Sequence, residues 1–166
     1  MVASPLVGLY DRIIERVART RAGAWVSMRL ATPIDRLVMR WTRGRISSGL
    51  GTRFQGRVAL VVVRGAKSGL ARTTPLLVTP DGDRLVLVAS YGGSQRNPAW
   101  YGNLKETPRC KALFDGAWRE YEAREAEGAE RARLWDLAVQ GYRGYADYQA
   151  RVDRRIPIMV LQPVGS

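Results

Sequence analysis

Histidine is absent from this chain of 166 residues, and cysteine occurs once, as Cys110. Without histidine, the Ser-His-Asp and Cys-His arrangements of nucleophilic hydrolases are excluded. A zinc site would need a cluster of cysteines or carboxylates, and none has suitable spacing, so we expect no metal site. A single cysteine forms no internal disulfide, which agrees with a reducing compartment. The chain therefore carries little acid–base or metal chemistry of its own.

Long apolar runs are also lacking, since none approaches the roughly 18 residues expected of a membrane span. The N-terminal stretch MVASPLVGLYDRIIERV is interrupted by Asp11, Arg12, Glu15 and Arg16, so it lacks the apolar core of a signal peptide. We therefore expect a cytoplasmic protein.

Acidic residues are few, because 15 Asp and Glu stand against 27 Lys and Arg and give a net charge of +12. Only Lys67, Lys105 and Lys111 are lysines, and this bias towards arginine is typical of a GC-rich genome. Arginines are concentrated in residues 1–57. Such an imbalance favours a nucleic acid, an anionic membrane surface or a polyanionic small ligand as partner.

The spacing of apolar residues divides the chain in two. In residues 1–50, the ranges 6–19 and 32–44 have apolar residues at helical spacing with arginines between them, which predicts a basic amphipathic helical segment. Residues 45–56 read as a glycine-rich linker. Residues 51–166 contain about six short β-branched runs, separated by turn signals and two helical stretches. We predict an α+β fold, with a small antiparallel β-barrel and peripheral helices.

Three stretches could bind a ligand. The loop RGAKSGLARTTPL, residues 64–76, follows a strand and offers an ammonium, a hydroxyl and a guanidinium with no acid among them, although it fails the Walker A pattern. Residues 88–104 run from a strand end through two glycines to the start of a helix. Tyr142, Tyr145 and Tyr148, spaced by three, would share one helical face. A solvated hairpin turn, a core tryptophan and ordinary tyrosine packing are the respective alternatives.

Taken together, GAKSGLARTTPL, LVLVASYGGSQRNPAWYGNLKETP and GYRGYADYQARVDRRIPIMVLQP resemble the deazaflavin (F420)-dependent nitroreductase family of actinobacteria. The resemblance covers roughly residues 50–163 in matching order and spacing. It implies a split β-barrel, coenzyme F420 as cofactor, and hydride transfer from the reduced deazaflavin to quinones or nitroaromatic compounds. A protein whose cofactor carries the chemistry needs few acid–base residues of its own.

The resemblance also implies roles for particular residues. The cofactor-binding positions are Ala66, Lys67, Ser68, Arg72, Thr73, Thr74, Pro75, Leu76, Leu77, Val78, Val88, Ala89, Ser90, Tyr91, Ala99, Trp100, Tyr101, Gly102 and Asn103. Lys67, Ser68 and Arg72 correspond to the phosphate-binding loop. The positions expected at the acceptor, in a catalytic role, are Ser90, Tyr142, Tyr145 and Tyr148.

Two positions depart from the family pattern. Tyr91 stands where lysine is common, so one contact to the anionic tail of the cofactor is expected to be missing. Leu77 stands where nitroreductases can carry a tyrosine, which favours quinone reduction over nitroimidazole reduction.

Other functions remain open at this point. A split barrel could instead bind FMN or haem, or could carry F420 without turnover. The charge alone permits a nucleic-acid binder, but no helix-turn-helix, zinc finger or aromatic RNA motif is present. The N-terminal helices could lie on the inner face of an anionic membrane, where lipid quinones reside, or could cap the barrel.

Overall fold

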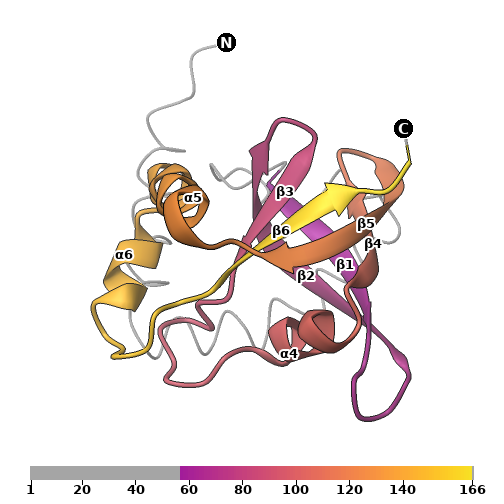
Figure 1. Cartoon of the computed structure of the whole chain (residues 1–166), viewed down its shortest axis with the longest axis horizontal. Coiled ribbons are helices and arrows are strands. Elements are labelled where there is room, and N and C mark those ends of the chain that lie inside the picture. The colour runs from indigo at the N-terminus through magenta and orange to yellow at the C-terminus, as the bar shows by residue number, and fades with distance from the viewer. Residues whose placement is uncertain (1–56, 166) are drawn as a thin grey trace, which may run out of the picture.

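Six antiparallel strands close into a barrel in the order β1-β2-β3-β6-β5-β4 (Figure 1). A computed structural model describes residues 57–165, so the helices and the linker expected in residues 1–56 lie outside the described part. The predicted barrel of about six strands is confirmed. Its elements are β1 (Val58–Arg64), β2 (Ala71–Asp81), β3 (Arg84–Val88), α4 (Ala99–Glu106), β4 (Arg109–Phe114), β5 (Ala117–Glu125), α5 (Gly128–Gly141), α6 (Gly144–Gln149) and β6 (Ile158–Pro163).

Turn residues set two of the hairpins. Between β4 and β5, Asp115 and Gly116 have φ angles of 49° and 76°, and two successive positive values are the signature of a two-residue hairpin turn. Gly82 has a φ of 65° between β2 and β3. Both turns were expected from the Asp-Gly pairs of the sequence, because aspartate and glycine adopt these angles at low cost.

The barrel is split along β2, which changes partner halfway along its length. Residues 71–77 pair with β1, whereas residues 78–81 pair with β3. Because β3 ends at Val88, which is followed by a loop of residues 89–98 and then α4, the first half of β2 has no strand on its second side. This interruption makes room for a cleft. A second weak point is the closure between β1 and β4, where Leu60, Val61 and Val62 are the only residues of β1 in the register.

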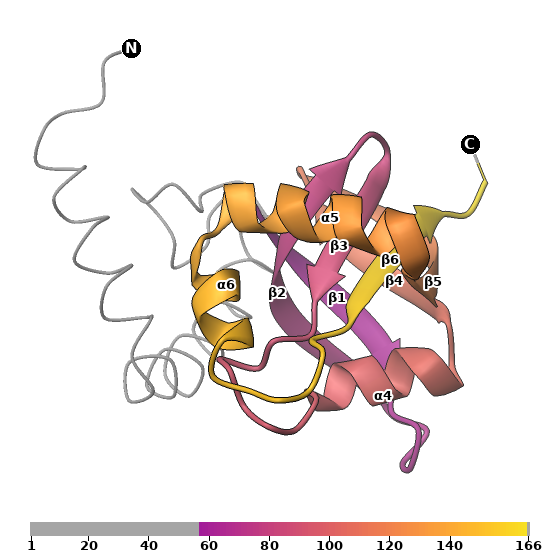
Figure 2. The ribbon, with the colours of Figure 1, turned by 60° about the vertical axis from the view of Figure 1, so that its left-hand side comes forward.

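The helices lie on different sides of the barrel (Figure 2). α4 follows Pro98, as the sequence predicts, and packs against β1 and β5 at the end where the β1–β2 loop protrudes. α5 packs against β2, β3 and β6, with Leu134 and Ala138 fully buried. Within the part of the chain that the structure describes, none of the helices has the length and apolar character to cross a membrane.

An ionic network fastens α5 to the barrel. Asp81, at the end of β2, accepts hydrogen bonds from both Nη atoms of Arg133 at 2.9 and 2.8 Å and also forms an ion pair with Arg84. Glu130 on α5 accepts two hydrogen bonds from Arg124, at 2.6 and 2.8 Å, and one from Arg84 at 3.0 Å. The hydrogen bonds from Arg133 are the main reason that the pKa of Asp81 falls to about 2, and those from Arg124 lower the pKa of Glu130 to about 2. Both carboxylates therefore favour the folded state while ionised.

Replacing Asp81 by asparagine is expected to lower the free energy of unfolding by about 1 kcal/mol at pH 7, as for a partly exposed ion pair. Because the folded-state pKa of Asp81 lies below its ordinary 3.8, the stabilisation is present above pH 4 and is lost as the pH falls towards 2. Urea unfolding at several pH values should therefore show the difference between wild type and Asp81→Asn shrinking over this range. Asp83→Asn, an exposed carboxylate on the same hairpin, is the matched control. A difference independent of pH would contradict the assignment.

Candidate functional site

A cleft of about 1190 Å³ opens where the barrel is split, between the β1–β2 loop, the first half of β2 and α4. Its lining residues are Val63, Gly65, Ala66, Lys67, Ser68, Ala71, Arg72, Thr73, Thr74, Ala99, Trp100, Gly102, Asn103 and Glu106. Ten of these were expected from the sequence to bind a cofactor, from the loop, the strand and the helix alike. The structure therefore brings together two of the three stretches singled out above.

The β1–β2 loop is a hairpin closed by two backbone hydrogen bonds. The Gly65 amide donates to Leu70 O at 2.8 Å, and the Gly69 amide donates to Gly65 O at 2.7 Å. A Cβ on Gly65 would lie 2.8 Å from Ser68 Oγ, so only glycine leaves room for that hydroxyl. The hairpin-turn interpretation is thus correct as a description of the backbone, while the side chains of the loop face a cleft.

One hydrogen bond ties this loop to the helix across the cleft. The Ala66 amide donates to Asn103 Oδ1 at 3.0 Å, and the two residues are 37 positions apart in the sequence. Asn103 lies in the middle of α4, so its amide side chain sets the distance between the loop and the helix. The width of the cleft is therefore fixed by a specific pair and not by packing alone.

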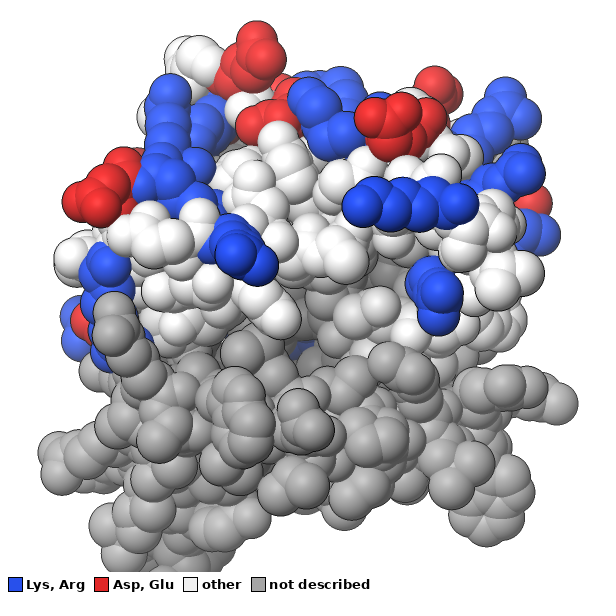
Figure 3. All heavy atoms as spheres, turned by 90° about the horizontal axis from the view of Figure 1, so that it is seen from below, with Lys and Arg blue, Asp and Glu red and all other residues white. Residues whose placement is uncertain are grey.

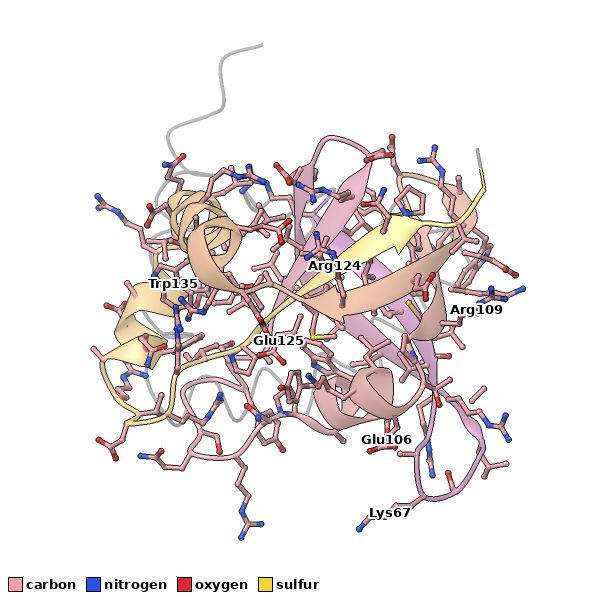
Figure 4. All side chains as sticks on the ribbon, viewed as in Figure 1. Lys67, Glu106, Arg109, Arg124, Glu125 and Trp135 are labelled. Atoms are coloured by element: carbon pink, nitrogen blue, oxygen red, sulfur yellow. The ribbon has the colours of Figure 1, made fainter. Side chains whose placement is uncertain are left out.

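The charges at the cleft favour an anion. Among the described residues, Lys67 and Arg72 have no carboxylate partner, and Glu106 is the one acid that lines the cleft. Figure 4 shows Lys67 and Glu106 at the same end of the molecule. In the view from this end, uncharged side chains occupy much of the described part of the face, and lysine and arginine side chains lie among and around them together with some aspartate and glutamate side chains (Figure 3). An ammonium, a guanidinium, a hydroxyl and backbone amides are a donor set that fits a phosphate group next to an apolar ring.

Several of the remaining β2 and α4 positions lie in or against the main core of the barrel. Trp100 is buried, with 8% of its surface exposed, and packs in the main core cluster together with Val78 and Ala89, while Leu76 and Tyr101 pack against that cluster. Tyr101 donates its hydroxyl to Glu125 Oε2 at 2.8 Å, and burial together with this bond raises the pKa of Tyr101. Trp100 is thus both a core residue and a wall of the cleft, which unites the two interpretations of this tryptophan.

The three tyrosines form a compact cluster, but they do not share one helical face. Tyr142 follows the end of α5, whereas Tyr145 and Tyr148 belong to α6. The ring centroids lie 5.1, 6.0 and 6.4 Å apart at edge-on angles, and the hydroxyls of Tyr142 and Tyr148 lie 2.9 Å apart. The prediction of a single helix was wrong because α5 ends at Gly141, just before Tyr142, and α6 begins anew at Gly144.

Each ring of this cluster is buried, with 5–7% of its surface exposed. Burial raises the pKa of Tyr145 well above its ordinary value, so its phenol stays neutral. Leu77 and Val88 pack against the same rings. The tyrosine cluster therefore packs against β2 and the end of β3, on the side of the barrel away from the β1–β2 loop.

Ser90 and Tyr91 lie in the loop that runs from β3 to α4. Ser90 is 7% exposed, and Tyr91 is about half exposed with a φ of 48°. This loop, residues 89–97, runs along the lower edge of the molecule from α6 towards α4 (Figures 1 and 2). It is the physical link between the tyrosine cluster and the cleft. Pro75, in the middle of β2, is half-buried and pairs with Leu60 of β1.

Sequence reasoning missed Glu106 and Arg154. Glu106 lies one turn after Asn103 on α4, so helical spacing from the expected residues could have found it. Arg154 binds the loop of residues 89–97 from more than 50 positions away along the chain, and its local sequence, one arginine among several, gives no signal for this.

A sequence profile that describes F420H(2)-dependent quinone reductases matches residues 35–163. The chain is similar to an F420H(2)-dependent quinone reductase of Mycobacterium tuberculosis, with 33% identity over 145 residues that cover 82% of this chain and 95% of that protein. A solved F420-H2 dependent reductase is 37% identical, has a TM-score of 0.61, and is matched over 64% of this chain and 94% of its own. A solved domain-swapped dimer is 32% identical, with a TM-score of 0.63 over 78% of this chain and 96% of its own.

Proposed function

Because this chain belongs to the F420H(2)-dependent quinone reductase family, we propose that it reduces a quinone with a hydride taken from reduced coenzyme F420. It is an oxidoreductase, and its cofactor is F420. The single observation that carries the proposal is the cleft, in which two cations that have no carboxylate partner among residues 57–165 stand beside an apolar wall of the barrel. That donor set suits a cofactor that has both a phosphate and a planar ring.

Lys67 and Arg72 would hold the phosphate of the cofactor, since an ammonium and a guanidinium fork are the usual partners of phosphate oxygens. The Ser68 hydroxyl would donate a further hydrogen bond. Thr73 and Thr74 on β2, with Trp100 on α4, would bound the ring. When bound, reduced F420 supplies the hydride. The protein then has to orient the cofactor and the quinone and to exclude water, and it needs no acid–base pair.

The quinone would lie between Ser90 and the tyrosine cluster. A hydroxyl from Ser90, or from Tyr142, Tyr145 or Tyr148, would donate to the quinone oxygen on which negative charge develops. Buried rings exclude water from this side, which strengthens such a hydrogen bond. Leu77 packs against the same rings and offers an apolar contact, which suits a quinone better than a nitro group.

Titration of the purified chain with F420 and with FMN, followed by fluorescence, tests the cofactor. We expect saturable binding of F420 and none of FMN at the same concentration. Oxidation of reduced F420, followed with and without menadione, then tests turnover. Binding of FMN but not of F420 would overturn the proposal, and binding of F420 without turnover would replace it with a carrier.

We also propose that residues 1–50 lie against the inner face of an anionic membrane, because the predicted helix of residues 32–44 places Arg36, Arg40 and Arg43 together. Replacing these three by glutamine is expected to release the protein from vesicles that contain anionic lipid, at about 1 kcal/mol per charge. Co-sedimentation with anionic and with neutral vesicles measures this release. Equal sedimentation of the variant and the wild type would mean that these arginines do not face a membrane.

A further inference from the structure

Arg154 holds the loop of residues 89–97 through a nearly complete set of hydrogen bonds. It lies between α6 and β6, and its guanidinium reaches across to the segment between β3 and α4. Nε donates to Ser94 O at 2.9 Å, Nη1 to Asn97 Oδ1 at 2.6 Å, and Nη2 to Ala89 O and Ser90 O at 3.1 Å and Arg96 O at 3.3 Å. No other side chain in the described part donates as many hydrogen bonds to one loop.

The loop that it holds has an unfavourable backbone. Tyr91, Gly92 and Gly93 have φ angles of 48°, 65° and 79°, and the first of these is a bulky residue in the left-handed region. Four carbonyl oxygens of this loop turn towards one point, where they would repel one another without a cation. The guanidinium at that point therefore offsets both costs, and only a planar fork can reach so many acceptors at once.

The held loop joins the two parts of the proposed site. Its first residues carry Ser90, and its last residue precedes Pro98, where α4 begins. In between, Gly93 lies so close to α6 that a Cβ there would be 3.3 Å from Tyr148 Cα. A shift of this loop would move Ser90, the start of α4 and the backbone beside the tyrosines together.

We propose that Arg154 is a positioning residue of the site. It acts through the loop of residues 89–97, which it fixes so that Ser90 and the start of α4 keep the geometry that the ring of the cofactor requires. The expected effect on catalysis rests on the proposed function. The structural part of the inference, the ordering of the loop, can be measured on the protein without cofactor.

The first test compares Arg154→Ala and Arg154→Lys with Arg155→Ala in amide hydrogen exchange without cofactor. Arg155 is the exposed neighbour and supplies a matched loss of charge. We expect exchange in residues 90–97 to become at least tenfold faster in Arg154→Ala and to change less in Arg154→Lys, which keeps one charge but loses the fork. Exchange unchanged in both Arg154 variants would overturn the proposal. The lysine variant keeps the test decisive if the alanine variant does not fold.

The second test is functional and uses F420 titration and menadione turnover. We expect Arg154→Ala to raise the Kd for F420 and to lower kcat, each by about tenfold, because the loop must then be ordered on binding, while the binding stoichiometry stays at that of wild type. Added guanidinium chloride, at concentrations that leave wild type folded, should restore part of kcat in Arg154→Ala and none in Arg155→Ala. A lower melting temperature with unchanged Kd and kcat would mean a purely structural role.

The two tests separate the possible failures. If the wild-type chain binds no F420, the proposed function is wrong, and the exchange experiment still decides whether Arg154 orders the loop. If F420 binds and turns over in Arg154→Ala as in wild type, the proposed function stands and the positioning role is wrong.

Discussion

Replacement of Lys67 and Arg72 by alanine in the same chain is expected to weaken F420 binding by about 100-fold or more. Each side chain would donate charge-assisted hydrogen bonds to the phosphate, and such bonds contribute about 1.5–3 kcal/mol each. Both residues line the cleft, and neither has a carboxylate partner in the described part of the chain, so no ion pair within that part is lost with them. The fold should stay intact, since both side chains are exposed. Fluorescence titration at two salt concentrations measures the loss of affinity and its electrostatic share.

Arg119→Ala combined with Arg155→Ala is the control. Both side chains are exposed and are not among the residues that line the cleft, and the two substitutions remove the same charge as the loop variant. If the control weakens binding as much as the loop variant, the effect comes from net charge. If the loop variant binds as well as wild type, residues 65–70 are a solvated turn and the phosphate lies elsewhere.

Substitution of Gly144 by alanine is expected to abolish most quinone reduction and to leave F420 binding in place. A Cβ on Gly144 would lie 2.2 Å from Cζ and 2.4 Å from the hydroxyl of Tyr142, so the buried ring has to move. Its movement breaks the contact between the hydroxyls of Tyr142 and Tyr148 and disturbs both edge-on pairs of Tyr142. Overpacking of this kind costs about 2 kcal/mol, which corresponds to a fall of about 6 °C in Tm. We expect kcat/KM for menadione to fall by at least about tenfold.

Gly141→Ala is the matched control in the same segment, because its Cβ would come close only to the end of the flexible Arg57 side chain, at 3.0 Å, and would make an ordinary contact with Thr79 Oγ1 at 3.8 Å. Tyr142→Phe separates the hydroxyl from the ring, since it keeps the packing and removes the oxygen. Wild-type turnover in Gly144→Ala, measured together with a lowered Tm, would show that the tyrosine cluster is a core and does not contact the quinone.

Local signals in the sequence were sufficient for the barrel and for one wall of the site. Alternation of β-branched residues and the Asp115-Gly116 pair act over a few residues, so strands and turns could be located from the chain alone. Lys67, Ser68 and Arg72 stand close together in the sequence and therefore remain together in the folded loop.

Contacts that depend on distant segments could not be predicted. Spacing by three suggested one helix for the tyrosines. In the structure the chain changes direction between α5 and α6 at Gly144. The ring of Tyr142 occupies the space that a side chain at position 144 would need, and no local signal marks this contact. The bonds of Arg154 are to backbone carbonyls, which every residue has, so no residue type marks the acceptors. The hydrogen bond between Ala66 and Asn103 likewise depends on how α4 packs against the end of β1, which local sequence does not show.

The limited pairing of β1 with β4 has a consequence for the order in which the chain folds. Hairpins such as β1–β2, β2–β3 and β4–β5 join neighbouring segments and require only short loops to close, whereas β1–β4 joins residues about 50 positions apart and β3–β6 joins residues about 75 positions apart. Since β1 gains few ladder bonds when it meets β4, this closure should come late, at or after the rate-limiting step. Until then β1 and β4 remain edge strands, able to pair with another chain as readily as with each other. Refolding yield should therefore fall as protein concentration rises, and valines 61 to 63 should be the segment that chaperones have to shield.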